Sequence, residues 1–384
     1  MRLTRAQQQE RTRASVLVAA AAEFAEHGYA EAKIDRIAER AELTRGAVYS
    51  NFPGKRSLYL AVLLDALPSR AAFPSRAAFP SHAPFPNRAA LPGQASAPPA
   101  DVAEAAEAFA RIWLERLPLT GDSAAAARFR SLSVTGVFDD QAGRAVQSEL
   151  LRLETLLLAL RLEGSRPRAD RRVRLAELIL TLLNGADHLA QTAAGFGDPF
   201  EVARACRYLA AMEGADEWDP PHLPYIPPAQ PCQEEWSPPA EMTDAIIDGP
   251  VSMHGDGIVV ILGSRRLGAA EEAVRAARPG DLITVAAVTA DPAETGALVR
   301  LRVTDLAGCL QRVFGPAGMP VRVILDENGL LAASAGVNAA EDTEAAVRIR
   351  AGKIIARAIG RGAGHAAAVA SRPGLAPTEE DVNE

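Results

Sequence analysis

The sequence predicts a mainly helical protein: a helix-turn-helix head and a second all-α domain, followed by a smaller α/β domain. Three observations lead to this fold class. Apolar residues recur with helical spacing through most of residues 1–213. Eight prolines then crowd residues 214–240. Beyond them, short β-branched runs alternate with helical patterns, which is typical of an α/β sandwich.

Length and composition indicate a soluble protein of several domains. A chain of 384 residues is too long for one ordinary core, and 48% hydrophobic against 23% charged residues is a globular balance. No apolar run is long enough to predict a membrane span, and the N-terminus lacks the pattern of a signal peptide. We therefore expect a cytoplasmic protein with no membrane partner. The three cysteines form no CxxC pair and predict no disulfide framework.

Charge is spread unevenly along the chain. The whole protein carries a net charge of −7, whereas residues 1–60 contain ten Lys or Arg against seven Asp or Glu. A basic head on an acidic body suits a protein that contacts a polyanion with one end only.

Residues 10–67 predict four helices joined by short turns. Leu17, Ala20, Ala21 and Phe24 share one face of the first helix, which Gly28 should end in a left-handed conformation. A second helix spans residues 34–41. Thr44 is placed to cap a third helix that ends near Asn51, and a fourth begins near Lys55.

The next segment is a tandem repeat. The hexapeptide PSRAAF at residues 68–73 recurs at 74–79 and, more loosely, at 80–85 and 86–91. A proline at every sixth position is incompatible with a helix or a central strand, so we predict a disordered insertion over residues 68–100. A docking segment rich in aromatic and basic side chains is the alternative.

Helical patterns return over residues 101–213. The predicted helices span residues 101–117, 122–135, 143–163, 168–194 and 199–213. The run 171–194 is apolar on more than one face, which predicts burial against a deep core or a second chain. The proline-rich residues 214–248 predict a semi-rigid linker.

Residues 249–365 predict an α/β domain. The expected elements are the strands Ile258–Leu262 and Leu282–Val288 with a helix at 268–277 between them, a hairpin of Val321–Leu325 with Leu330–Ser334, and a closing helix at 341–358. Residues 366–384 are expected to form a disordered tail.

The head resembles the DNA-binding domain of the TetR family of transcriptional regulators. The resemblance lies in FAEHGY at 24–29, IAERA at 37–41, LTRGAVYSNFPGK at 43–55, and the apolar positions Leu58 and 60–62. It implies a TetR-like helix-turn-helix, with residues 101–213 as the family's ligand-binding and dimerisation domain. The implied partners are double-stranded DNA with a palindromic operator, a second copy of the chain and an unknown small-molecule effector that releases a repressor.

The physical reading of the third helix agrees with this resemblance. A helix that enters the major groove needs small or polar residues at its N-terminal end, where bulk would prevent close approach. Arg45 can reach guanine or a phosphate, Tyr49 can donate to a phosphate, and Lys55 adds charge at the start of the fourth helix. Val48 and Phe52 should point inward. The candidate DNA-binding residues are Lys33, Thr44, Arg45, Gly46, Ala47, Tyr49, Ser50 and Lys55.

Several of these assignments have alternatives. Thr44 could serve only as a helix cap, and Arg36 and Arg40 could be surface charges or DNA contacts. Two positions depart from the family pattern: Lys33 stands where Thr is usual, and Glu42 where Gly is common. A left-handed conformation at Glu42 would cost about 1 kcal/mol.

The effector site is less sharply indicated. Trp113, Phe129, Phe138 and the interior pair Asp187 and His188 could line a pocket in the helical domain, or they could belong to its core. No cofactor and no metal site are predicted.

Residues 249–365 resemble the thioredoxin-like fold of peroxiredoxins. The resemblance lies in residues 258–262, in Gly318–Val321, where that fold places a cis-proline before a strand, and in residues 324–329. Where redox members carry cysteines, this chain has GSRRL at 263–267, so no thiol chemistry and no enzyme activity are expected. Cys309 should be a small buried hydrophobe. The alternatives are a bifunctional regulator whose C-terminal domain is redox-active or ligand-sensing, and a helical scaffold that does not bind DNA.

Overall fold

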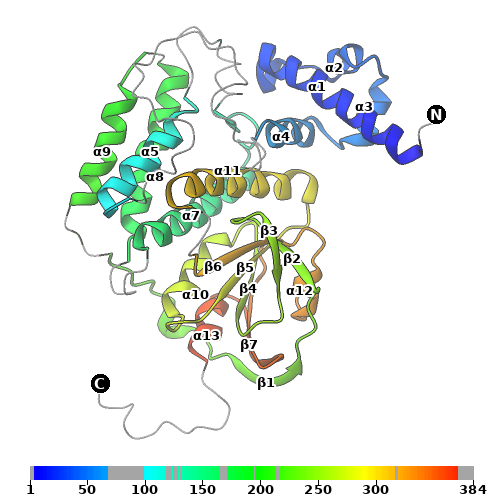
Figure 1. Ribbon diagram of the computed structural model, residues 1–384. Coiled ribbons are helices and arrows are strands. Elements are labelled where there is room, and N and C mark those ends of the chain that lie inside the picture. Colours follow the sequence, from blue (N-terminus) through cyan, green and yellow to red (C-terminus); the bar gives the residue numbers. More distant parts are fainter. Residues whose placement is uncertain are drawn as a thin grey trace, which may run out of the picture.

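The structure is a computed structural model, and it describes residues 4–67, 99–117, 123, 129, 131–164, 171–193, 195–212, 214, 216–315 and 319–370. Three predictions therefore lie outside the described residues: nearly all of the hexapeptide insertion, most of the helix at 122–135, and the end of the tail. The chain forms a helical head, a bundle of long helices and an α/β part with one large sheet (Figure 1).

The head consists of α1 (Arg5–Glu31), α2 (Ile34–Arg40), α3 (Arg45–Asn51) and α4 (Lys55–Ala66). The left-handed Gly28, with φ 69°, kinks the last turn of α1, and Thr44 caps α3, as predicted. Apolar side chains from the four helices meet in one core, in which the rings of Phe24 and Tyr59 pack edge to face with centroids 4.9 Å apart. This core fixes α3 on the surface of the head.

The helical bundle contains α5 (Val102–Leu114), α7 (Gln141–Glu163), α8 (Val173–Thr192) and α9 (Pro199–Ala211). Asp101, Asp140 and Asp198 cap three of these helices by accepting backbone N–H groups at 2.7–2.8 Å. The predicted helix at 122–135 is wrong over its described end, because residues 131–135 form turns and extended chain.

A mixed sheet of eight strands, in the order β1-β8-β7-β4-β5-β6-β2-β3, forms the α/β part. Its central strands β4 (Gly257–Gly263), β5 (Ile283–Val288) and β6 (Val321–Leu325) are parallel. Side chains alternate along β4: Val260 joins the core shared with the helices, and Val259 joins a second core on the other face. The sequence predicted these strands, and α10 (Ala270–Ala276) occupies the predicted helix between two of them.

Two predicted elements of this part are wrong. Leu330–Ser334 is not a strand but the short helix α12, because the Asp326 carboxylate accepts the Ala332 N–H at 2.9 Å and favours a helical turn. The predicted helix at 341–358 is a hairpin of β7 (Glu344–Arg350) and β8 (Lys353–Ile359). Its two-residue turn places Ala351 and Gly352 at φ 47° and 72°, the left-handed region that tight hairpins require. The closing helix is α13 (Ala363–Val369), so the predicted disordered tail is wrong over residues 366–369.

The predicted linker is also wrong in part. β1 (Gln230–Glu235) pairs with β8, and β2 (Glu241–Asp244) pairs with β6 and with β3 (Gly249–Ser252). Prolines are tolerated there because β1 is an edge strand. The sheet therefore begins about twenty residues before the predicted domain.

The predicted β-α-β order is observed in β4-α10-β5, whereas the β-β-α order predicted over residues 321–358 is wrong, because that segment forms β6-α12-β7-β8. No peptide bond among the described residues is cis, so Pro320 lacks the cis form that the peroxiredoxin resemblance implies. The thioredoxin-like assignment stays a prediction.

One helix of the α/β part belongs equally to the bundle. α11 (Ala297–Phe314) lies alongside α7 and also contacts α4 and α5 (Figure 1). Its apolar face joins the same buried cluster as the head and the bundle. The three parts are thus packed together through α11 and are not connected by a linker alone.

Candidate nucleic-acid interface

The outer face of α3 presents the predicted reading residues to solvent. Thr44, Arg45, Gly46, Tyr49 and Ser50 are exposed, and Ala47 is half-buried. Val48 and Phe52 are buried, as predicted, and hold the helix on the head. Because the residues at the start of α3 are small and those along it are polar, this helix can enter a groove of DNA.

The structure is compatible with both roles that the sequence left open for Thr44, a helix cap and a DNA contact. Its Oγ accepts the Ala47 N–H at 3.2 Å, which makes it the cap of α3. The side chain is also exposed, so a capped Thr44 remains accessible to a phosphate or a base edge.

Arg45 is the most accessible cation of this face. Its guanidinium lies 3.4 Å from Asp35 and 5.5 Å from the centroid of the Tyr49 ring, and both members of the ion pair are more than 60% exposed. Tyr49 and then Asp35 raise the pKa of Arg45. An ion pair this open is weak, so a phosphate or guanine can replace Asp35.

The two lysines differ in accessibility. Lys33 is exposed, and its backbone N–H donates to the Glu23 carboxylate at 3.1 Å. Lys55 is half-buried: its amino group donates to the Ala30 carbonyl at 3.0 Å and lies 4.9 Å from the Tyr29 ring centroid. Burial lowers the pKa of Lys55. Lys55 can contact DNA only after the hydrogen bond between its amino group and the Ala30 carbonyl is broken.

The turn before α3 carries an exposed carboxylate. Glu42 has φ 55°, the left-handed conformation expected where the family pattern has Gly. The residue is exposed next to the reading face, where its negative charge opposes the approach of phosphates.

Arg36 and Arg40 are structural residues of the head. Both guanidinium groups form ion pairs with Glu23, at 3.1 and 3.4 Å, and the Glu23 side chain is completely buried. Arg40 also donates to Glu26, and this bond lowers the pKa of Glu26. The sequence analysis did not predict this cluster. The acidic residue at position 23, next to the core residue Phe24, was the feature that could have indicated it.

Arg13 is a second residue that the sequence analysis missed. Its guanidinium stacks 4.5 Å from the centroid of the Phe52 ring and donates to the Asn51 carbonyl at 3.5 Å. It thereby joins α1 to the C-terminal end of α3 and supports the orientation of that helix.

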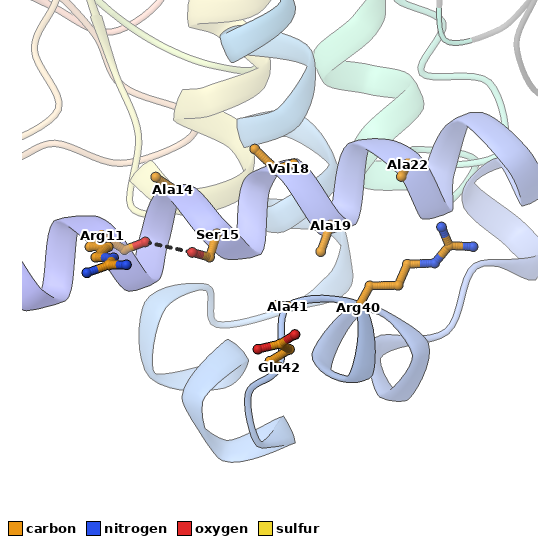
Figure 2. A pocket seen from close by; sticks show the side chains of 9 residues that line it. All are labelled: Arg11, Ala14, Ser15, Val18, Ala19, Ala22, Arg40, Ala41 and Glu42. Atoms are coloured by element: carbon orange, nitrogen blue, oxygen red, sulfur yellow. Dashed lines mark hydrogen bonds between the residues drawn. The ribbon is translucent and has the colours of Figure 1, made fainter.

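A shallow groove of about 670 Å³ runs between α1 and the turn after α2 (Figure 2). Its floor is mainly apolar, and charged side chains stand at its edge. The lining residues are Arg11, Ala14, Ser15, Val18, Ala19, Ala22, Arg40, Ala41 and Glu42.

Four of the residues predicted for an effector pocket are not alike. Trp113 and Phe138 are buried, and different cations cover them: Arg116 lies 4.0 Å from the Trp113 ring centroid and Arg56 lies 4.7 Å from that of Phe138. Phe129 is half-buried. His188 is exposed, so its prediction as an interior residue is wrong, because it lies on the outer face of α8.

Among the described residues of the bundle, the buried polar atoms that lack a hydrogen-bond partner include the Trp113 indole Nε1 and Oδ1 of Asp187. The other Asp187 oxygen accepts from Gln191 at 2.8 Å, and burial raises the pKa of Asp187. The indole N–H of Trp113 can donate to a polar group of a ligand, and the free carboxylate oxygen of Asp187 can accept from one.

Among the residues that the structure describes, no helix is long and apolar enough to cross a membrane, and no cluster of side chains could hold a metal ion.

Comparison with known proteins identifies the head. Residues 16–62 match the sequence family described as "Bacterial regulatory proteins, tetR family". The chain is also similar to a protein of Streptomyces coelicolor named "HTH-type transcriptional repressor SCO4008", with 44% identity over 54 residues. The match covers 14% of this chain and 28% of that relative, well under two thirds of its length.

Proposed function

We propose that this chain is a TetR-family transcriptional regulator, because its helix-turn-helix head matches that family, and that it acts as a homodimeric repressor of transcription. It binds a palindromic operator and is released by a small-molecule effector. The exposed, polar N-terminal half of α3, with Arg45 as its most accessible cation, carries the DNA-binding part of this proposal.

Dimerisation is supported by apolar side chains that the chain leaves exposed on α8 and α9. Phe200 and Tyr208 are exposed on α9, Met212 is exposed directly after it, and Leu178 and Leu189 are exposed on α8. Exposed apolar side chains of this kind favour a second copy of the same helices as their cover. Two-fold symmetry would present two copies of α3 to two half-sites.

Effector release requires a ligand that prefers one arrangement of the two heads. We place the effector in the helical bundle, near the unpartnered polar atoms of Trp113 and Asp187. Thiol chemistry in the C-terminal part is not favoured, because burial raises the pKa of Cys309 to about 11 and leaves the thiol protonated. We propose a non-enzymatic role for that part.

The operator can be found by selection. Purified full-length protein is incubated with a pool of randomised DNA duplexes, and the bound fraction is amplified and sequenced over several rounds. We expect an inverted repeat whose half-sites are separated by about one helical turn, roughly 10 base pairs. Failure of any motif to be enriched would contradict the proposal.

A further inference from the structure

Arg56, the second residue of α4, joins all three parts of the molecule. Its guanidinium lies 3.1 Å from Asp140, which caps α7 of the bundle, and 3.5 Å from Glu294 of the α/β part. The same group lies over the Phe138 ring. Of these partners, only Glu294 comes from the C-terminal part of the chain. A TetR-type head does not by itself require that part.

Glu294 is held rigidly where it meets the head. It lies in the helical turn Pro292–Gly296, directly before α11. The Asp291 carboxylate accepts the N–H groups of Glu294 and Thr295 at 3.1 and 3.2 Å, which anchors this turn to the end of β5. A Cβ placed on Gly54 would lie 3.1 Å from the Glu294 carboxylate, so the acid reaches the very start of α4.

A contact at the start of α4 acts on α3 through a short, stiff connection. Only residues 52–54 separate the two helices, and Phe52 is buried. Most of α4 is itself buried, from Ser57 to Leu63, so it moves as a unit with the head. A displacement of Arg56 would therefore change the orientation of the reading face.

We propose that Glu294 is a positioning residue for DNA binding, through which the C-terminal α/β part holds the head by way of Arg56. The inference rests on the proposed function and adds a role for the part of the chain that the family match leaves unexplained. A ligand or partner that displaces the turn at 292–296 would change DNA affinity without touching the bundle's effector site. The contact narrows the range of head orientations, and a preorganised head binds more tightly.

A double-mutant cycle tests this role. Glu294→Gln keeps the shape of the side chain and removes its charge. We expect it to weaken binding to the selected duplex by about threefold, the scale of a partly exposed ion pair, with little change in Tm. In an Arg56→Gln background the same substitution should have no further effect. The matched control is Glu327→Gln, which breaks the exposed Arg300–Glu327 pair at the other side of α11.

The contact itself can be tested without DNA. Gly54→Cys combined with Glu294→Cys should be joined by a short bifunctional thiol cross-linker that spans the length of the lost Glu side chain, detected by peptide mapping, whereas Gly54→Cys alone should give no such cross-link. A Glu294→Gln affinity equal to that of Glu327→Gln, or an undiminished effect of Glu294→Gln in the Arg56→Gln background, would overturn the positioning role. Absence of the cross-link would overturn the contact. If the wild-type protein bound no DNA while the double-cysteine variant was cross-linked, the proposed function would be refuted and the contact would stand.

Discussion

The Glu154 carboxylate of α7 accepts two hydrogen bonds, of 2.8 and 2.7 Å, from the Arg302 guanidinium of α11, and the Glu154 side chain is almost completely buried. Arg116 of the bundle forms a second ion pair, with Asp305, about one turn further along α11. Both ion pairs lie across the boundary between the helical bundle and the α/β part. Such paired charges tolerate burial only while both partners stay in place.

Breaking the Glu154–Arg302 pair should destabilise the whole protein. Glu154→Gln leaves the Arg302 charge without its counterion, which typically costs about 3 kcal/mol. Because the cores are continuous, we expect one cooperative unfolding transition at a lower urea midpoint. Glu327→Gln, at an exposed pair on the same helix, should change stability by less than about 0.5 kcal/mol. Equal midpoints for the two variants would show that α11 is not needed to hold the parts together.

The left-handed Glu42 offers a test of the turn before α3. Glu42→Gly should raise stability by about 1 kcal/mol, because Gly adopts φ 55° without the steric cost that Glu bears. It should also tighten DNA binding by removing a carboxylate from the reading side. Glu42→Ala separates the two effects: it should tighten binding without the gain in Tm. A Tm rise of equal size in both variants would contradict the backbone explanation.

Thiol reactivity tests whether the C-terminal part has redox chemistry. Burial raises the pKa of Cys206 to about 12 and that of Cys309 to about 11, so at pH 8 roughly one Cys309 thiol in a thousand is ionised. We expect iodoacetamide to modify only the partly exposed Cys232 in the native protein, and all three cysteines after denaturation. Rapid labelling of Cys309 in the native protein would support the alternative in which the C-terminal part is redox-active.

The exposed apolar side chains of α8 and α9 should control the oligomeric state. Tyr208→Glu places a charge among them, and we expect it to convert a dimer to a monomer in sedimentation velocity experiments. Tyr225→Glu is the control, because Tyr225 is even more exposed and lies outside α8 and α9. A wild-type protein that sediments as a monomer would contradict the dimer.

The sequence predicted best where local signals agree with the tertiary structure. The kink at Gly28, the cap at Thr44 and the inward Val48 and Phe52 all follow from residue type and spacing. It failed at residues 341–358, where it predicted a helix. Pairing with β4 decides that segment, and this is a long-range interaction that periodicity does not reveal.

The candidate site shows the same limit. The exposed residues of α3 were predictable from the motif, but their surroundings were not. Lys55 is tethered to Ala30, and Arg36 and Arg40 are bound to Glu23, because chain segments distant in sequence meet in the head. The contact between Arg56 and Glu294 spans 238 positions of sequence and has no local signature.

The most direct test of the central claim is an anisotropy titration of the selected duplex with wild-type protein, Arg45→Ala and Arg300→Ala, at two salt concentrations. We predict that wild-type affinity falls by roughly a thousandfold or more between 50 and 200 mM salt, as expected for several phosphate contacts. Arg45→Ala should bind about tenfold more weakly, and Arg300→Ala, on α11, should match the wild type. Wild-type binding no tighter to the selected duplex than to a shuffled one, or unchanged binding by Arg45→Ala, would contradict the assignment of α3 as the DNA-reading helix.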